Sequence, residues 1–172
     1  MDDKIVLGSG DVYVKEFEGE IPENSVLETP ENKLGYIQGG ATLEYKPTYY
    51  SCKDDSGVVQ KTIITEEEAT LKTGILTFCG KTLAVLCETG RVTESGGTRT
   101  VKIGGIKNAN LIHFHHKDKV DGDIRVTIVG KNESGFSLAF AKDKETVIDA
   151  EFKCQPQDNE GTLIKYQEAI SE

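Results

Sequence analysis

Two strand-like tracts flank a polar insert that has too little aliphatic content to form a core of its own. The tracts span residues 34–46 and 58–78, and the second is the richer in β-branched side chains. Between them lies the insert, residues 47–57, with the sequence PTYYSCKDDSG. A long arm of this kind either extends into solvent or docks on another copy of the chain. The function depends on which of the two occurs.

The length of 172 residues fits one domain, which buries roughly 70% of its unfolded surface when it folds. We therefore expect a single domain over residues 1–172, with the arm around residues 46–61. The sequence contains no run of about 18 apolar residues that would span a bilayer. Residues 1–7 lack the basic start and long apolar run of a secretory signal, so we expect synthesis in the cytosol.

The chain is acidic, with a formal net charge of −9. A protein that grips DNA or RNA needs a basic face for the phosphates, so this class is disfavoured. An acidic surface past which nucleic acid slides without sticking remains compatible with the charge. The alternative is that the charge serves solubility alone.

Alternation of apolar and polar residues with period two recurs along most of the chain and predicts antiparallel strands. Gly-, Asn- and Asp-rich turn signals separate these runs. The pattern favours a β-sandwich or rolled barrel. The alternating runs are 69–76, 100–103, 112–115, 124–129, 136–141 and 147–154.

One segment has helical instead of strand periodicity. Within residues 80–88, Leu83, Leu86 and Cys87 fall at positions i, i+3 and i+4. We expect one short helix that packs this apolar stripe against an end or face of the sandwich. In the preceding long tract, Gly39 and Gly40 predict a bulge or sharp bend, since neither has the spacing of a phosphate-binding loop.

The residues that most often carry chemistry do not form a recognisable motif. The four cysteines are scattered without a C-x-x-C pair, which predicts free and mostly buried thiols in a reducing compartment. No serine, cysteine or lysine nucleophile lies in a known catalytic context. Glu66, Glu67 and Glu68 favour a solvated or lumen-facing strand over an acid pair for hydrolysis. We expect a non-enzymatic protein without a cofactor. The cysteines are Cys52, Cys79, Cys87 and Cys154.

Two histidines leave an alternative open. His113 and His115 point the same way on a strand and offer two corners of a metal site, but Lys117 occupies the next position on that face. Exposed surface histidines are the plainer interpretation, and we expect no metal. A metal-dependent enzyme built on these two histidines is the corresponding rival hypothesis.

Three stretches together resemble the tail tube proteins of tailed bacteriophages, particularly long-tailed phages of Gram-positive bacteria. The first is 34–47 with the turn at 54–57, and the second is 65–76. The third covers residues 118–130, continues through residues 135–152 and ends with residues 158–164. The likeness covers roughly residues 34–166. Tail-like bacteriocins and gene transfer agents use the same building block.

The resemblance implies a β-sandwich with one flanking helix, six copies of which form a ring. Rings stack into a tube around the tape measure protein, which leaves before DNA passes to the host cell. An extended hairpin reaches between subunits or rings. Further partners implied are tail terminator and distal tail or baseplate proteins, with a sheath protein where the tail is contractile. The location implied is the virion tail, assembled in the host bacterial cytoplasm, with no membrane contact.

On this basis we expect the arm to make contacts between subunits, with three tyrosines as aromatic anchors. The alternative is that these tyrosines pack within the chain's own sheet. The expected arm residues are Tyr45, Lys46, Tyr49, Tyr50, Lys53, Asp54 and Asp55. The expected channel-lining residues are Glu44, Glu66, Glu68 and Lys72. The alternative function is a β-sandwich binding module for carbohydrate or a host surface, for which the Tyr49–Tyr50 pair is the candidate contact.

Overall fold

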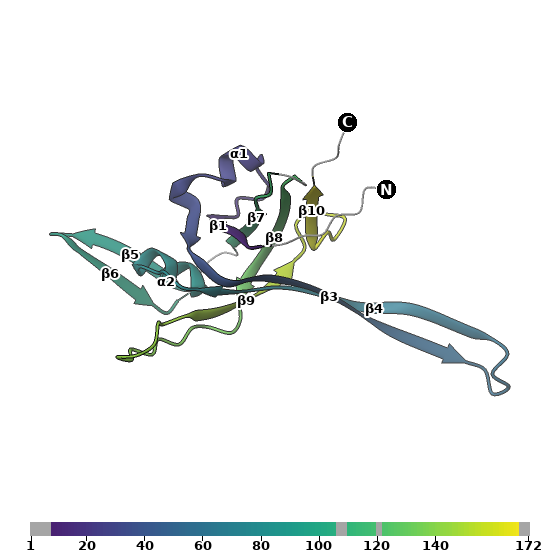
Figure 1. Cartoon of the computed structure of the whole chain (residues 1–172). Coiled ribbons are helices and arrows are strands. Elements are labelled where there is room, and N and C mark those ends of the chain that lie inside the picture. The colour runs from purple at the N-terminus through teal and green to yellow at the C-terminus, as the bar shows by residue number, and fades with distance from the viewer. Residues whose placement is uncertain (1–7, 106–109, 120–121, 169–172) are drawn as a thin grey trace.

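The computed structural model describes residues 8–105, 110–119 and 122–168. In this part, the chain is mainly antiparallel β-structure with two short α-helices, a β-sandwich-like fold from which a long hairpin extends (Figure 1). The elements are β1 (Gly10–Glu16), α1 (Asn24–Leu27), the 3-10 helix η1 (Pro30–Asn32), β2 (Lys33–Gly35), β3 (Ile37–Lys53), β4 (Gln60–Ile75), α2 (Gly80–Leu86), β5 (Gly90–Ser95), β6 (Thr98–Ile103), β7 (Asn110–His116), β8 (Ile124–Asn132), β9 (Ile148–Gln155) and β10 (Ile164–Glu168).

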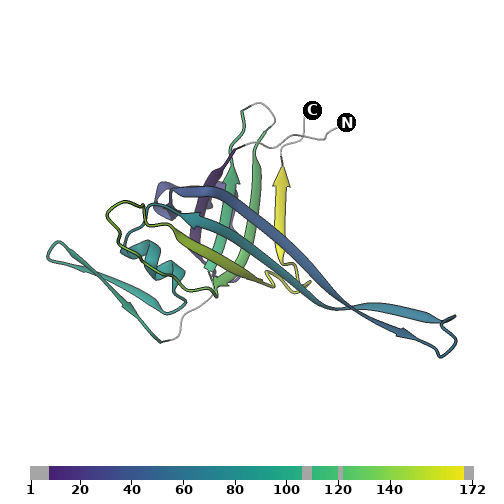
Figure 2. The ribbon, with the colours of Figure 1, turned by 60° about the horizontal axis from the view of Figure 1, so that its bottom comes forward.

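The main sheet rolls up on itself. Its strand order is β2-β1-β7-β8-β9-β4-β3, with β10 pairing with β8 beside this path. Only Tyr36 separates β2 from β3, so one continuous stretch of chain forms both ends of the order. β8 divides one edge between two partners, because its first half pairs with β10 and its last residues pair with β9 (Figure 2). The predicted β-sandwich or rolled barrel is therefore confirmed.

The core lies between the two walls of the rolled sheet. β1, β7 and β8 contribute Val12, Ile112 and Ile128, while β4 and β9 contribute Leu71 and Phe152. Each of these five side chains is almost fully buried. Their neighbours in sequence point to the opposite face of the sheet, as the period-two pattern predicted.

The predicted bulge in the first long tract is confirmed. The pairing register of β3 and β4 shifts between Gln38 and Ala41. The two residues in between, Gly39 and Gly40, have φ angles of 79° and 74°. Side chains rarely tolerate such values, so glycine is required for this bend at the base of the hairpin.

The predicted helix forms, but its buried stripe differs from the expectation. α2 ends at Leu86, and its buried side chains are Thr82, Ala84 and Leu86, whereas Leu83 and Cys87 are only partly buried. Thr82 is drawn inward because its hydroxyl donates a hydrogen bond to the Leu34 carbonyl at 3.0 Å. The sequence pattern did not predict the one-turn helix α1.

The strand predicted for residues 136–141 does not form. The segment lies in the long connection between β8 and β9, and an isolated bridge between Ala141 and Lys144 is the pairing recorded there. Phe140, expected on an apolar strand face, is 84% exposed. Two carbonyls of this connection accept side-chain hydrogen bonds instead of ladder bonds: Gly135 from Asn132 Nδ2 at 2.6 Å, and Ala139 from the Thr146 hydroxyl at 2.6 Å.

The cysteines are free, but the expectation that most are buried is wrong. Cys52 and Cys79 are exposed, and Cys87 and Cys154 are partly buried. Cys154 packs against the core, and this burial raises the pKa of its thiol to about 11.

Replacing Phe152 by alanine tests the position of the core. Phe152 is fully buried between the walls, so the Phe152→Ala variant should lose about 3–5 kcal/mol of unfolding free energy in chemical denaturation. Phe140→Ala is the matched control and should change this free energy by less than about 0.5 kcal/mol, since Phe140 is exposed. Equal losses in the two variants would contradict this core.

Candidate functional site

The hairpin of β3 and β4 extends far beyond the body of the molecule (Figure 1). The two strands stay paired from Ile37 opposite Ile75 to Lys53 opposite Gln60. β9 pairs with β4 only from Thr70 onward. Within the described chain, residues 45–69 thus form a ribbon of two strands and a turn, which we call the arm. It is longer than the expected 46–61, because β4 gains its second neighbour only at Thr70.

A structured turn closes the tip of the arm. The Asp54 carboxylate accepts hydrogen bonds from the Val59 backbone N–H at 2.8 Å and from the Ser56 hydroxyl. The hydrogen bonds from Ser56 and Val59 hold the pKa of Asp54 below its ordinary value. Gly57 adopts a φ of 71° at this turn, and its N–H donates to the Asp54 carbonyl. The tip is therefore preorganised, which reduces the entropy that docking costs.

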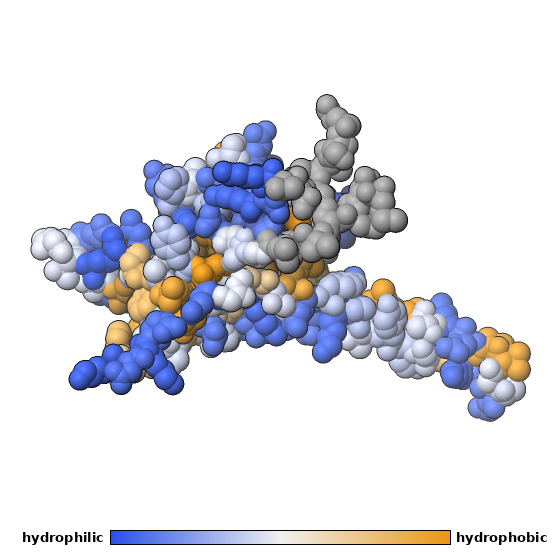
Figure 3. Space-filling view, viewed as in Figure 1, coloured by the Kyte–Doolittle hydropathy of each residue, from blue (hydrophilic) through white to orange (hydrophobic). Residues whose placement is uncertain are grey.

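Apolar and aromatic side chains remain exposed along the whole arm, and Figure 3 shows hydrophobic patches toward its end. A ribbon of two strands cannot form a core that would cover them. Exposed apolar residues gathered on one element mark an interaction surface. They are Tyr45, Tyr49, Tyr50, Val58, Val59, Ile63 and Ile64, with exposed fractions from 47% to 82%.

The arm is apolar on both of its faces. Tyr49 lies opposite Ile64, and Tyr50 lies opposite Ile63 in the paired register. Successive residues of a strand point to opposite sides, so these two pairs lie on different faces. The tyrosines are more than half exposed, and packing within the chain's own sheet does not account for them.

The remaining expected arm residues are polar and exposed. The Tyr45 hydroxyl donates a 2.5 Å hydrogen bond to the Glu67 carboxylate across the ribbon, which raises the pKa of Tyr45. Lys46 lies opposite Glu68 in the register, and Lys53 lies beside the turn. Asp54 shapes the turn, and Asp55 follows it at the tip.

Three of the four expected channel-lining residues meet on one exposed face at the base of the arm. Lys72 lies 2.9 Å from Glu44 and 3.8 Å from Glu151, and Glu68 lies 3.3 Å from Lys153. We call this set, Glu44, Glu68, Lys72, Glu151 and Lys153, the polar face. The fourth expected residue, Glu66, lies further out on the arm opposite Thr48.

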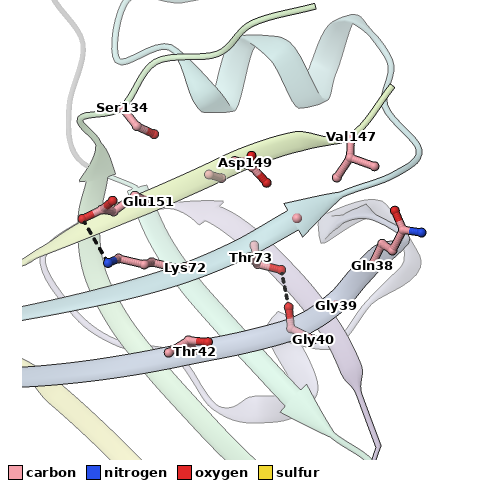
Figure 4. A pocket seen from close by; sticks show the side chains of 12 residues that line it. Gln38, Gly39, Gly40, Thr42, Lys72, Thr73, Ser134, Val147, Asp149 and Glu151 are labelled. Carbon is pink, nitrogen blue, oxygen red and sulfur yellow. Dashed lines mark hydrogen bonds and ion pairs between the residues drawn. The ribbon is translucent and has the colours of Figure 1, made fainter. Parts of the chain in front are cut away.

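A shallow groove of about 380 Å³ crosses the sheet beside the polar face (Figure 4). Gln38, Gly40, Lys72, Asp149 and Glu151 are among the residues that line it. The hydrogen bond and charge of Lys72 hold the pKa of Glu44 below its ordinary value. A carboxylate held ionised in this way is a poor general acid, so the arrangement suits a solvated wall better than acid–base catalysis.

The structure also contains a buried polar cluster that the sequence pattern did not predict. His113 and His115 are almost fully buried, so the interpretation of them as exposed surface histidines is wrong. Glu28, which follows α1, reaches both rings: its Oε1 lies 3.1 Å from His113 Nε2, and its Oε2 lies 3.1 Å from His115 Nδ1. Arg125 Nε donates to Glu28 Oε1 at 2.5 Å, and His115 Nε2 lies 2.7 Å from Asp123 Oδ2. We call these five residues the Glu28 cluster.

The cluster fastens the α1 segment to the outer face of β7 and β8. Burial raises the pKa of the Glu28 carboxyl, but hydrogen bonds from Arg125 and His113 outweigh it, and the pKa lies below its ordinary value. Burial lowers the pKa of His113, whose Nδ1 lies 2.7 Å from the Thr127 hydroxyl. His113 therefore favours its neutral form and Glu28 its ionised form.

The two histidines do not meet the requirements of the rival metal hypothesis. Their ring nitrogens already face Glu28, Thr127 and Asp123. Among the residues that the structure describes, no group of three or more His, Cys, Asp or Glu side chains is arranged to hold a metal ion. The contacts of the cluster join Glu28, which follows α1, to β7 and β8.

Acidification should therefore weaken the fold in two stages. His113 resists protonation in the folded chain, so the unfolded chain binds more protons below about pH 6.5, and stability falls as the pH drops. The depressed pKa of Glu28 adds a further loss below about pH 4.5. Urea unfolding at pH 7.5, 6 and 5 should show the first stage, and His113→Gln should reduce it.

Removing the charge of Glu28 isolates the cluster at neutral pH. Glu28→Gln should lower the free energy of unfolding by about 1–3 kcal/mol, because Arg125 and His113 lose their shared carboxylate acceptor. Glu18→Gln, an exposed carboxylate, is the control and should change little. Identical unfolding curves for the two variants would contradict the role of the cluster.

No protein-family model matches the sequence, and no curated protein matches it. Neither helix in the described residues is long and apolar enough to cross a membrane.

Proposed function

We propose that the chain is a non-enzymatic structural subunit that assembles with copies of itself through the arm. The observation that carries this proposal is the set of seven exposed apolar side chains on a preorganised ribbon that leaves a small β-body. Covering the exposed half of one such side chain is worth on the order of 1 kcal/mol, so the set supplies several kcal/mol to an interface.

The assembly that best accommodates such an arm is a stack of rings. A head-to-tail contact pairs two different surfaces, and it closes into a ring or continues into a filament according to its rotation. Together with the sequence resemblance, this supports the tail tube of a tailed phage or a phage-derived particle, built from hexameric rings. Its partners would be further copies of the chain, the tape measure protein, and the terminator and distal tail proteins.

The polar face fits the wall of a channel in this tube. Its lysines and glutamates are paired with one another and exposed, and the whole chain carries a net charge of −9. Such a wall repels phosphates instead of binding them, which lets DNA pass without retention. Location in the virion tail belongs to the same proposal.

The rival function, a β-sandwich binding module for carbohydrate or a host surface, gains less from the geometry. It needs an aromatic platform on one surface. Tyr49 and Tyr50 are adjacent in β3 and face opposite sides of the ribbon. A contact that clamps the arm from both sides fits this arrangement better than a flat sugar platform.

Shortening the arm tests the proposal directly. Residues 48–66 are replaced by Asn-Gly, which joins the paired residues Pro47 and Glu67 by a two-residue turn. The variant should unfold with the same midpoint as the full chain, because the core is untouched, but remain monomeric in sedimentation velocity and form no tubes in negative-stain images. Tubes of normal length from this variant would refute the role of the arm.

Charge reversal tests the channel wall. Particles carrying Glu44→Lys and Glu151→Lys, two substitutions on the polar face, should assemble but deliver DNA less efficiently, because cations on the wall retain phosphates. The matched control is Glu18→Lys with Glu20→Lys, two exposed carboxylates away from the arm. DNA transfer per assembled particle is the measurement, and equal transfer by both variants would remove the electrostatic claim.

A further inference from the structure

The connection between β8 and β9 contains a segment with the pattern of a strand but no place in the sheet. Residues 135–141 have the sequence GFSLAFA, in which large apolar residues alternate with small ones. Phe136 and Leu138 pack partly against the core, while Phe140 is 84% exposed. Of its described backbone, only Ala141 takes part in a bridge, with Lys144. The Gly135 and Ala139 carbonyls accept side-chain hydrogen bonds, so the segment has strand propensity and an anchored base but, in the described chain, no strand partner.

The arm has a strand edge that lacks a partner. β9 follows β4 as far as the pair Thr70 and Lys153 and then leaves it, with Pro156 just beyond the end of β9. Residues 60–69 of β4 therefore pair with β3 on one side and, within the described residues, with no strand on the other. A free strand edge is a template for a strand from another chain.

The two surfaces face different sides of the molecule. In Figures 1 and 2 the arm extends to one side of the body, and the β8–β9 connection lies on the other side, near α2. The segment begins near the base of the arm, where Ser134 lines a pocket with Glu68, but the outer part of the free edge points away from it and is available to a different neighbour. A contact between these two surfaces is head-to-tail and leaves both end copies able to bind another.

Charge and apolar character also match across this contact. The arm carries three consecutive carboxylates, Glu66 to Glu68, along β4, and the exposed Ile63 and Ile64 lie nearby. Phe140 is followed by a turn that presents the exposed Lys142 and Lys144, with the acidic Asp143 between them and Glu145 after them. An added strand places Phe140 on the apolar part of the arm and the lysines within reach of the carboxylates.

We propose that residues 135–141 of one copy are the acceptor for the arm of a second copy, adding as a strand to the free edge of β4 between residues 60 and 69. The inference rests on the proposed function, since it names the surface on which the arm docks. Phe140 is the apolar anchor of the contact, and Lys142 and Lys144 set its position on the arm.

A complementation experiment tests this pairing. The shortened-arm variant keeps the acceptor, and Phe140→Asp keeps the arm. Each alone should remain monomeric at concentrations at least tenfold above those at which the full chain associates. A 1:1 mixture should associate in sedimentation velocity, because one intact arm then meets one intact acceptor. Val26→Asp, which alters an exposed apolar residue on α1, is the control and should associate like the full chain.

Charge exchange provides a second, independent readout. Lys142→Glu with Lys144→Glu should weaken association at least tenfold, and Glu66→Lys with Glu67→Lys in the same chain should restore it. Normal association of Phe140→Asp, or of the lysine variant, would overturn the acceptor while leaving the proposed function in place. A full-length chain that stays monomeric at every concentration would overturn the proposed function itself.

Discussion

One half of β4 lies in the packed body and the other half lies in the arm. The rest of the structure depends on this division. The last six residues of β4 are paired on both sides and contribute Leu71 and Ile75 to the core. Its first ten residues have β3 as their ladder partner and carry exposed isoleucines and glutamates. The buried half fixes the direction and register of the exposed half, because both are one continuous strand. A firmly packed body thereby holds a ribbon with exposed apolar side chains at a distance from itself.

Much of this division could be predicted from the sequence. Alternation with period two identified most core strands correctly, since side chains of a sheet that faces water on one side follow that period. The arm was also predictable, because its insert lacks aliphatic residues for a core. The Gly39–Gly40 bulge followed from the backbone freedom that only glycine has.

The features that escaped prediction depend on contacts between distant parts of the chain. His113 lies against Glu28, 85 positions away, and no local pattern shows that this residue reaches β7 and β8. The 136–141 segment has the alternation of a strand, yet Phe136 and Leu138 pack partly against the core and the Ala139 carbonyl accepts a hydrogen bond from the Thr146 hydroxyl instead of from a neighbouring strand. In α2, the Leu34 carbonyl draws Thr82 inward, against the apolar stripe. Local periodicity indicates the secondary structure that a segment favours, but its contacts in the tertiary structure decide whether that structure forms.

The β3–β4 hairpin has two register shifts, and a change of angle at such a shift displaces the tip of the arm. One lies at its base, between Gln38 and Ala41, and the other lies partway out, between Thr48 and Tyr49. Nine residues from Tyr45 to Lys53 span about 30 Å at about 3.3 Å per residue. The bend at the base lies still further from the tip than Tyr45, so a change of about 10° there moves the tip by at least about 5 Å, roughly the spacing of neighbouring strands. The curvature of any assembly built through the arm is thus encoded in a few backbone angles inside each subunit.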